Sequence, residues 1–241
     1  MALFWWRYFN IRPFSPDWTR LEEVVEFGRR NPVRGFNREC IRSYIFWRLH
    51  EHLNCTSFVE TGTMYGNTTG FVNRVFDTPV FTSEINDTYY LVNRANLIWA
   101  RGVTNHHSNS VEFLNSLCDG DRLGDNPMFY LDAHWYDYMP LADELCCIIR
   151  KCRKAVILID DFMIPNELRY RYDEYPDVRI DMALIRSSFK GQRQDYGVYL
   201  PNYDPDLDPT GLGIGFAVVL VGQEESLSTN LFPFDLLDQT E

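Results

Sequence analysis

The sequence lacks the short motifs that assign many proteins to a class at once. Neither the dinucleotide-binding pattern G-x-G-x-x-G nor the P-loop pattern G-x-x-x-x-G-K-[ST] occurs in it. None of its six cysteines forms a C-x-x-C pair, so the usual spacing of zinc and redox sites is missing. No apolar run reaches the roughly 18 residues that a transmembrane helix needs. These absences favour a globular protein with reduced thiols and argue against a membrane partner.

A net positive charge is missing as well. The chain has a formal net charge of −11, and phosphate binding depends on Lys and Arg, so no nucleic-acid partner is expected. The start, MALFWWRYFNIRPF, has no cationic segment followed by an apolar one and is a poor signal peptide. We therefore expect a cytoplasmic protein. Its aromatic start is expected to pack on the domain, on a second copy in a homo-oligomer, or near a substrate mouth.

The chain has enough apolar residues for a full core and an alternation of strand and helix patterns. Of its 241 residues, 45% are hydrophobic, which suits one domain with additions. A helical N-terminal extension is expected over 1–54, followed by a Rossmann-like domain over 55–222 and a tail over 223–241. Within the domain, the Tyr-rich, Arg-rich and Asp-rich segment 162–195 would cover the substrate.

The alternation predicts an α/β fold with a seven-stranded, mostly parallel sheet, helices on both faces and a closing antiparallel hairpin. Strands are expected at 57–60, 80–83, 102–106, 128–131, 155–159, 196–200 and 213–221. Helices are expected at 18–30, 37–53, 67–76, 88–100, 110–117, 141–151 and 182–189.

The most informative segment is CTSFVETGTMYGNTT, from Cys55 to Thr69. It predicts a buried strand that turns through Gly62, Thr63 and Gly66 into a helix. Such a turn offers free backbone N–H groups and the positive end of a helix dipole, and its glycines allow a ligand to approach the main chain. Glu60, however, ends the strand, and its carboxylate disfavours a phosphate at this place. A cationic or hydroxyl-bearing ligand fits better, which indicates S-adenosylmethionine.

Acidic residues end four successive predicted strands: Glu60, Glu84, Asp132, and the pair Asp160 and Asp161. The carboxyl ends of parallel strands meet at one edge of the sheet, where ligands bind in open α/β folds. Glu84 follows Gly62 by 22 residues, a spacing that suits an acceptor for a ribose diol. The alternative is an acid that belongs to the start of the next helix, because Asn86 and Asp87 follow it.

Asp132, Asp160 and Asp161 are expected to lie side by side, where three carboxylates would repel one another without a cation or protons. Oxygen ligands of this kind favour Mg²⁺, with Mn²⁺ or Ca²⁺ as alternatives. Asp160 or Asp161 could instead cap the following loop. His134 lies two residues beyond Asp132 and suits a general base, a substrate-orienting group or a structural role.

Two further features bear on the pocket. Ser110 follows the third predicted strand and could line an adenine pocket or cap a helix. Tyrosines and a tryptophan over 135–175 alternate with charges, which suits the wall of a wet site.

With these residues in view, the chain resembles the class I S-adenosylmethionine-dependent methyltransferases. It is most similar to the metal-dependent O-methyltransferases of the catechol and macrolide-sugar (macrocin) type. FVETGTMYGNTT, FTSEIND, FYLDAHW and LIDDF carry the resemblance. The resemblance implies that the cofactor contacts are Glu60, Thr61, Gly62, Thr63, Gly66, Thr68, Glu84, Ser110 and Asp132. It also implies that Asp132, Asp160 and Asp161 bind the metal, with Asp132 and His134 taking part in catalysis.

The sequence departs from the catechol enzymes at two positions. Trp135 stands where those enzymes carry a lysine base, so His134 is the nearest replacement. Asp161 stands where they carry Asn, as in the sugar-modifying group. The resemblance implies methyl transfer to a hydroxyl of a sugar, glycan or small-molecule diol. The alternatives are a metal-dependent glycosyltransferase or hydrolase that uses Asp160 and Asp161, and a non-catalytic binding module with the same fold.

Overall fold

The computed structural model describes residues 18–32, 34–134, 138–176, 178–208, 210–223 and 237–240. The strands are β1 Ser57–Thr61, β2 Val80–Glu84, β3 Val103–His107, β4 Pro127–Leu131, β5 Ala155–Ile159, β6 Glu174–Tyr175, β7 Val178–Arg179, β8 Tyr196–Pro201, β9 Ala217–Val221 and β10 Leu237–Thr240. The α-helices are α2 Trp18–Arg30, α3 Cys40–His52, α4 Asn67–Val75, α5 Asp87–Asn96, α6 Ser110–Cys118, α7 Leu141–Lys151 and α8 Met182–Phe189. Short 3₁₀ turns are η2 Phe36–Arg38 and η3 Pro205–Leu207.

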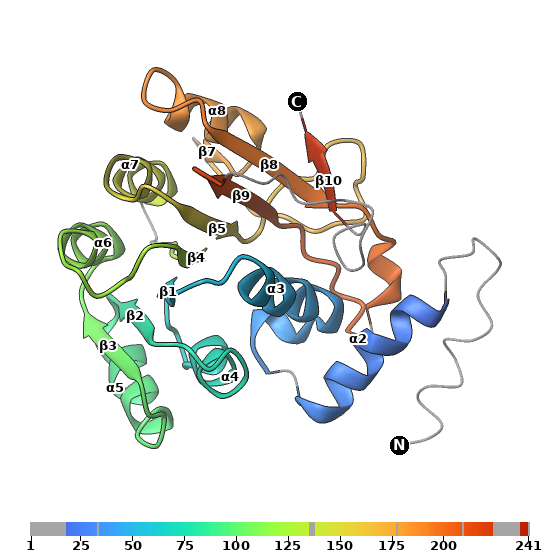
Figure 1. Ribbon diagram of the computed structural model, residues 1–241, viewed down its shortest axis with the longest axis horizontal. Coiled ribbons are helices and arrows are strands. Elements are labelled where there is room, and N and C mark those ends of the chain that lie inside the picture. The colour runs from blue at the N-terminus through green and yellow to red at the C-terminus, as the bar shows by residue number, and fades with distance from the viewer. Residues whose placement is uncertain are drawn as a thin grey trace.

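One large sheet organises the molecule, with the strand order β10-β8-β9-β5-β4-β1-β2-β3 (Figure 1). Strands β1 to β5 pair in parallel, whereas β9 is antiparallel to both β5 and β8. The predicted fold class is therefore confirmed, including the closing antiparallel hairpin. Because the order reverses at β1, the carboxyl ends of β4, β1 and β2 lie next to one another, which is where an open α/β sheet forms its ligand crevice.

Helices cover both faces of the sheet (Figure 1). On one face, α6, α7 and α8 pack over alternate strand residues such as Val59, Phe129 and Ile157. On the other face, α2, α3 and α4 pack over the intervening residues, among them Phe58 and Met128. Strands β4, β5 and β9 are buried on both faces and are apolar at every position, which explains why their positions could be predicted.

The N-terminal helices are part of the same packed structure. Helix α3 buries Ile41, Tyr44, Ile45 and Leu49 in the apolar cluster that also contains β1 and β4. The division of the chain at residue 54 stays a prediction. Strand β10 was not predicted: it pairs antiparallel with β8 at the sheet edge, and its sequence LDQT carries no strand pattern. The aromatic start, which was predicted to pack on the domain, on a second copy or near a substrate mouth, lies outside the described residues, as do residues 224–236 of the predicted tail.

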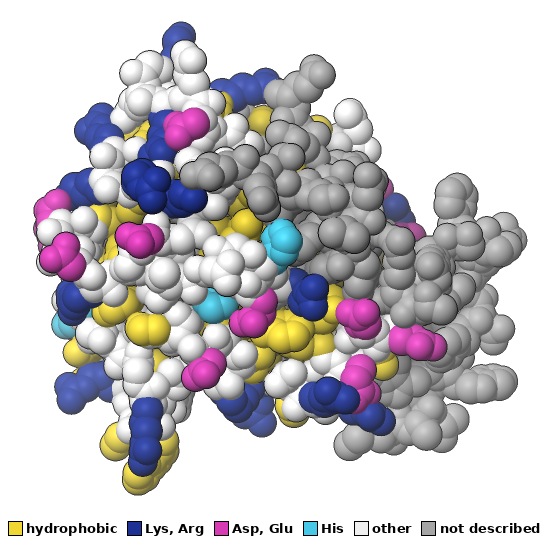
Figure 2. All heavy atoms as spheres, viewed as in Figure 1, with side chains coloured by type: hydrophobic (Ala, Val, Ile, Leu, Met, Phe, Trp, Pro, Cys, Tyr) yellow, Lys and Arg dark blue, Asp and Glu magenta, His cyan; other side chains and the backbone are white. Residues whose placement is uncertain are grey.

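The described helices are all too short or too polar to cross a membrane. On the face shown in Figure 2, acidic, basic and apolar side chains are interspersed over the described part of the surface. The negative net charge therefore does not form one continuous acidic area on that side.

Candidate active site

The glycine turn after β1 brings two strands into close contact. Gly62 has a φ of +85°, and a Cβ there would lie 2.7 Å from the backbone oxygen of Asp132. Gly66 has a φ of +78° and precedes α4. At Gly62 a side chain is thus excluded by the end of β4, so this glycine serves the approach of two chain segments.

The expectation of several free N–H groups in this turn is wrong for four of its residues. The N–H groups of Gly62 and Thr63 both donate to the Ser83 oxygen at 3.1 Å, and that of Gly66 donates to the Thr63 oxygen at 2.8 Å. The N–H of Met64 donates to Glu84 Oε2 at 2.7 Å. Strand β2 runs directly beside the turn and supplies the acceptors for Gly62, Thr63 and Met64, whereas the turn itself supplies the acceptor for Gly66.

Glu60 is buried at the end of β1. Its Oε2 accepts hydrogen bonds from the hydroxyls of Thr69 and Thr82, the latter at 2.9 Å. Burial raises the pKa of the Glu60 carboxyl to about 7, although the two hydroxyls act in the opposite direction. Glu60 thereby links β1, β2 and α4, and the methionine-binding role implied by the resemblance stays a prediction.

The threonines predicted to contact the cofactor make different contacts. Thr63 shares a hydrogen bond with Thr82, with their hydroxyl oxygens 2.6 Å apart, and Thr68 Oγ1 accepts from the N–H of Phe36 at 3.1 Å. Thr61 is fully buried, and its hydroxyl has no hydrogen-bond partner.

Glu84 lies at the tip of β2, directly beside the glycine turn. Its Oε2 accepts from Met64 and its Oε1 accepts from the N–H of Asn86 at 2.8 Å. Asn86 itself caps α5 by accepting from the N–H groups of Thr88 and Tyr89. The carboxylate and the cap are therefore separate groups, and each carboxylate oxygen retains a second lone pair for a ribose hydroxyl.

The ends of β4 and β5 bring three metal-ligating side chains together. One ligand atom each from Asp132, His134 and Asp161 lies within 4.8 Å of the others. Burial raises the pKa of Asp132 well above its usual value, and the nearby Asp160 and Asp161 add to this. Burial, together with Asp160 and Asp173, raises the pKa of Asp161 to about 8. A cation among these side chains would relieve their repulsion.

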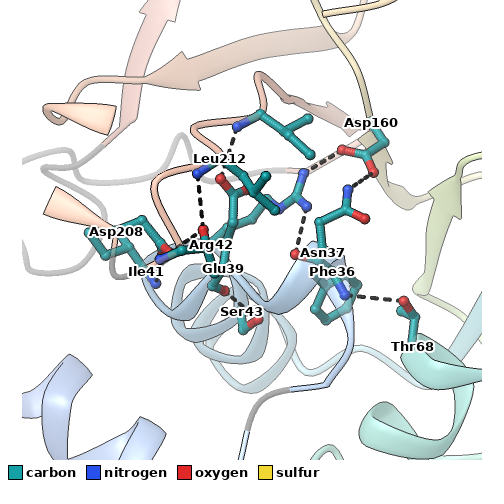
Figure 3. A network of polar contacts seen from close by, with 12 residues as sticks. Phe36, Asn37, Glu39, Ile41, Arg42, Ser43, Thr68, Asp160, Asp208 and Leu212 are labelled. Carbon is teal, nitrogen blue, oxygen red and sulfur yellow. Dashed lines mark hydrogen bonds and ion pairs between the residues drawn. The ribbon is translucent and has the colours of Figure 1, made fainter. Parts of the chain in front are cut away.

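Asp160, predicted as a metal ligand with Asp132 and Asp161, has other partners in the structure (Figure 3). Arg42 Nη1 donates to its Oδ1. The Tyr130 hydroxyl and the Asn37 amide donate to its Oδ2, at 2.5 Å and 3.2 Å. The backbone turns sharply at Asp161, whose φ is +52°. Asp160 is thus neutralised by the protein, and its predicted role as a metal ligand is not supported by these contacts.

Arg42 is the functional residue that the sequence reasoning missed. Its side chain is 0% exposed and lies between Asp160 and Glu39, whose Oε2 is 3.1 Å from Arg42 Nε. Its Nη2 donates to the Phe36 oxygen at 2.6 Å. Burial raises the pKa of Glu39 to about 7, and Arg42 opposes this shift. An arginine flanked by buried apolar residues in a helix needs a buried partner, and this was the available signal.

The turn Phe36–Arg38, which contributes to this network, has an unusual backbone conformation. Phe36, Asn37 and Arg38 have φ values of 49°, 57° and 67°, so three residues other than glycine in a row are left-handed. Such conformations cost about 1–2 kcal/mol per residue and persist only where the surroundings hold them. The contacts to Asp160, Arg42 and Thr68 provide that hold (Figure 3).

A second group of buried polar atoms surrounds the crevice. The hydroxyls of Thr61, Ser83 and Ser110 and both carboxylate oxygens of Glu144 have no hydrogen-bond partner among the described residues. Burial raises the pKa of Glu144 to about 7, and the nearby Ser110 and Thr61 hydroxyls oppose the shift without reaching hydrogen-bond geometry. Ser110 does not cap α6, because Asn109 accepts from the Glu112 N–H at 2.9 Å. A helix-cap role for Ser110 is therefore wrong.

The predicted aromatic wall is realised only in part. The ring of Tyr175 lies 6.2 Å from that of His134. Tyr170 instead belongs to the core and donates its hydroxyl to the Tyr203 oxygen at 2.6 Å. Trp135 and Tyr136 lie outside the described residues.

The protein is similar to known proteins in structure but matches none of the compared families or curated proteins in sequence. Among solved structures, it is similar to an O-methyltransferase from Bacillus cereus in complex with SAH, with a TM-score of 0.56 and 16% identity over 92% of this chain and 97% of that one.

Two further structures match to the same degree. The O-methyltransferase TomG from Streptomyces achromogenes, involved in tomaymycin synthesis and solved with SAM, has a TM-score of 0.57 and 16% identity over 92% of this chain and 96% of that one. A putative O-methyltransferase from Klebsiella pneumoniae has a TM-score of 0.55 and 19% identity over 92% and 97%. The chain thus has the fold of the class I methyltransferases that its sequence resembles.

Proposed function

We propose that the protein is an S-adenosylmethionine-dependent O-methyltransferase that uses a divalent metal ion to act on a hydroxyl of a sugar, glycan or small-molecule diol. The fold supports the reaction type, since the similar structures are O-methyltransferases, two of them solved with SAM or SAH. Fold alone does not determine function, so the residues of the site must support the proposed reaction.

The observation that carries the proposal is the order of groups along the carboxyl edge. Strand β1 with its glycine turn lies between β2, which ends in Glu84, and β4, which leads to Asp132. Glu84, the proposed ribose acceptor, and Asp132, in the proposed metal site, thus lie on opposite sides of the turn. The unpartnered hydroxyls of Thr61, Ser83 and Ser110 at this edge fit a polar ligand, because buried polar groups are normally hydrogen-bonded.

The protein's contribution to such a reaction is orientation and charge. When bound, S-adenosylmethionine supplies a methyl group already activated by its sulfonium. Glu84 would hold the ribose through its remaining lone pairs, and Glu60 would keep the turn in place through Thr69 and Thr82. Methyl transfer forms a carbon–oxygen bond as the carbon–sulfur bond breaks, and the hydroxyl proton leaves to a base for which His134 is the candidate from the sequence.

The carboxylates of Asp132 and Asp161 fit a divalent ion by donor chemistry and by their separation, and His134 lies within 4.8 Å of both, where it could take up the proton of an acceptor hydroxyl. Such an ion would lower the pKa of an acceptor hydroxyl. Two vicinal oxygens, as in a sugar diol, would suit two open positions on it. Asp160 would act through Arg42 by holding the N-terminal helix α3 against the site.

Calorimetric titration with S-adenosylmethionine, with and without added Mg²⁺ or Mn²⁺, tests the proposal. We expect micromolar binding that weakens by roughly 10-fold to 100-fold in Glu84→Ala, the size of a lost hydrogen bond to a charged group. The matched control is Glu112→Ala, an exposed acid in the first turn of α6 that is not among the predicted cofactor contacts. Absence of cofactor binding by the wild-type protein would overturn the proposal, and nucleotide sugars would then test the glycosyltransferase alternative.

A further inference from the structure

We infer that a groove between helix α4 and the end of helix α5 is a second ligand site, which binds a sugar that carries a phosphate or sulfate group. The inference goes beyond the proposed function and does not depend on it. Of the residues predicted to contact the cofactor, only Gly66 lines this groove, and none of the acids at the strand ends does. The groove is therefore separate from the crevice at the carboxyl edge of the sheet.

The groove has a volume of about 770 Å³, which lies within the range of pockets that bind small molecules. One wall is α4, and the other is the end of α5 with the turn that follows it; the two helices lie side by side in Figure 1. Asn96 Nδ2 donates to the Tyr65 oxygen at 2.9 Å, and Asn73 Nδ2 donates to the Arg101 oxygen at 2.5 Å. These two hydrogen bonds hold the walls in place, so the groove is formed before any ligand binds.

Positive charge is concentrated in the groove. Three arginines from different parts of the chain line it, Arg34, Arg74 and Arg101, and none of the described residues that line it is acidic. In the described part of the chain these three arginines form no ion pair, whereas Arg29 and Arg169 pair with carboxylates. Because the chain as a whole has a net charge of −11, such a local positive field is specific to this place and attracts an anion.

Arg74 is held in an orientation that suits an oxyanion. Its guanidinium lies 5.8 Å from the centre of the Phe71 ring, and its Nη2 donates to the Pro32 oxygen at 3.5 Å. A guanidinium has five N–H donors, so the others can bind two oxygens of a phosphate or sulfate as a pair. The planar, fixed group loses little conformational freedom when it does so.

The other lining residues suit a sugar ring. Trp99 is 89% exposed, so its large apolar face is open to a ligand in the groove. A sugar ring that packs on this face would remove apolar surface of both partners from water. Asn73 and Asn96 also line the groove, and their amide oxygens can accept hydrogen bonds from sugar hydroxyls.

Calorimetric titration of the full chain with glucose 6-phosphate and glucose 6-sulfate tests the inference. Glucose and inorganic phosphate serve as probes of each part alone, and S-adenosylmethionine is left out. We expect at least one ester to bind more tightly than inorganic phosphate, and glucose to bind too weakly to measure. The ester with the higher affinity identifies phosphate or sulfate as the group that the arginines recognise.

Substitutions locate the site. Arg74→Gln and Arg101→Gln should each weaken binding of the preferred ester by about tenfold, through loss of a hydrogen bond to a charged group. Arg153→Gln is the matched control, because Arg153 is exposed in the turn between α7 and β5 and should not affect binding.

The ring contact is tested with Trp99→Ala, which should weaken binding by about fivefold. Its control is Ile98→Ala, since Ile98 is 70% exposed but does not line the groove. All these side chains are exposed, and thermal unfolding confirms that the variants fold. Absence of binding by both esters, or an equal loss in Arg153→Gln and Arg74→Gln, would overturn the inference.

Discussion

The two halves of the carboxyl edge treat their acidic residues differently. In the β1–β2 half, Glu60 and Glu84 receive their hydrogen bonds from neighbouring hydroxyls and backbone N–H groups. In the β4–β5 half, a distant arginine neutralises Asp160, while Asp132 and Asp161 face each other and His134. The first half is completed locally by β2 and α4. The second half depends on helix α3 and leaves two carboxylates for an external cation.

This difference distinguishes acidic residues that can position a ligand from acidic residues that can bind an ion or transfer a proton. Acids satisfied by the protein are fixed in place and suit the recognition of a ligand. The pKa of Glu60 is raised as well, but two hydroxyls donate hydrogen bonds to it. Asp132 and Asp161 instead combine raised pKa values with the nearby carboxylate of Asp160, an arrangement typical of sites that bind ions or move protons. The following four substitutions test the contrast between the halves, from the largest expected effect to the smallest.

Arg42→Met should destabilise the β4–β5 half most. It leaves Asp160 and Glu39 buried without their cation, for an expected loss of about 3–5 kcal/mol in the free energy of unfolding. Thr82→Val in the β1–β2 half removes a hydroxyl from Glu60 and should cost only about 1 kcal/mol. Urea unfolding measures both, and adding Asp160→Asn to Arg42→Met should restore part of the loss. Equal losses in the two single variants would contradict the contrast.

Glu60→Gln should change the pH dependence of stability. The folded pKa of about 7 lies above the ordinary value of 4.5 for a glutamate, so the folded state binds more protons between these values and stability falls as pH rises. Glutamine cannot ionise, so it does not contribute to this loss of stability as the pH rises. Relative to wild type, the variant should gain about 2–3 kcal/mol between pH 5 and pH 8 in urea unfolding. If the free energies of unfolding of the variant and the wild type differed by the same amount at pH 5 and pH 8, burial would not raise the pKa of Glu60 in the folded protein.

Gly62→Ala should push the glycine turn after β1 away from the end of β4, because a Cβ at this position would lie 2.7 Å from the backbone oxygen of Asp132. Gly191 is the matched control, since its φ of +73° imposes the same left-handed strain while nothing lies within 4 Å of its Cβ position. We expect Gly191→Ala to cost about 1 kcal/mol and Gly62→Ala at least about 2 kcal/mol. Similar thermal unfolding midpoints for the two variants would mean that the turn can shift away from β4.

Asn86→Ala should have the smallest effect of the four, about 1 kcal/mol, through loss of the α5 cap beside Glu84. Asn109→Ala, which removes the α6 cap, should cost the same. Ser110→Ala should leave the free energy of unfolding nearly unchanged, because the hydroxyl has no partner. A loss at Ser110 as large as at Asn109 would show that its hydroxyl stabilises the protein after all.

The strands and most helices could be predicted because their signals are local. An apolar run that ends in an acid predicts a buried strand and its carboxyl end together, as at Ala155–Ile159. The approach of Asp132 and Asp161 was predicted from the rule that parallel strands end at one edge, whereas the presence of His134 in the same group was not. Strand β10 escaped prediction because it exists through pairing with β8, and its own residues favour no strand.

The different contacts of Asp160, which pairs with Arg42, and Asp161, which lies near Asp132 and His134, could not be predicted. The two residues are chemically identical and adjacent, and a left-handed backbone at Asp161 gives them different neighbours. The partner of Asp160 lies 118 residues earlier in the chain. No pattern of spacing within one sequence relates residues so far apart, whereas a buried charge on a helix at least signals that some partner exists.

The contacts of the segment around helix α3 carry a consequence for how the chain folds. Asn37 and Arg42 meet Asp160 across 123 and 118 residues, and Ile41 and Glu39 meet Asp208 and Ile214 across 167 and 175. At a synthesis rate of about 5–20 residues per second, their partners leave the ribosome roughly 6 to 35 seconds after α3 itself. Such distant contacts close late, because they carry the largest loop-closure entropy. Helix α3, although it is made early, is therefore among the last elements to dock, and its docking completes the second half of the site.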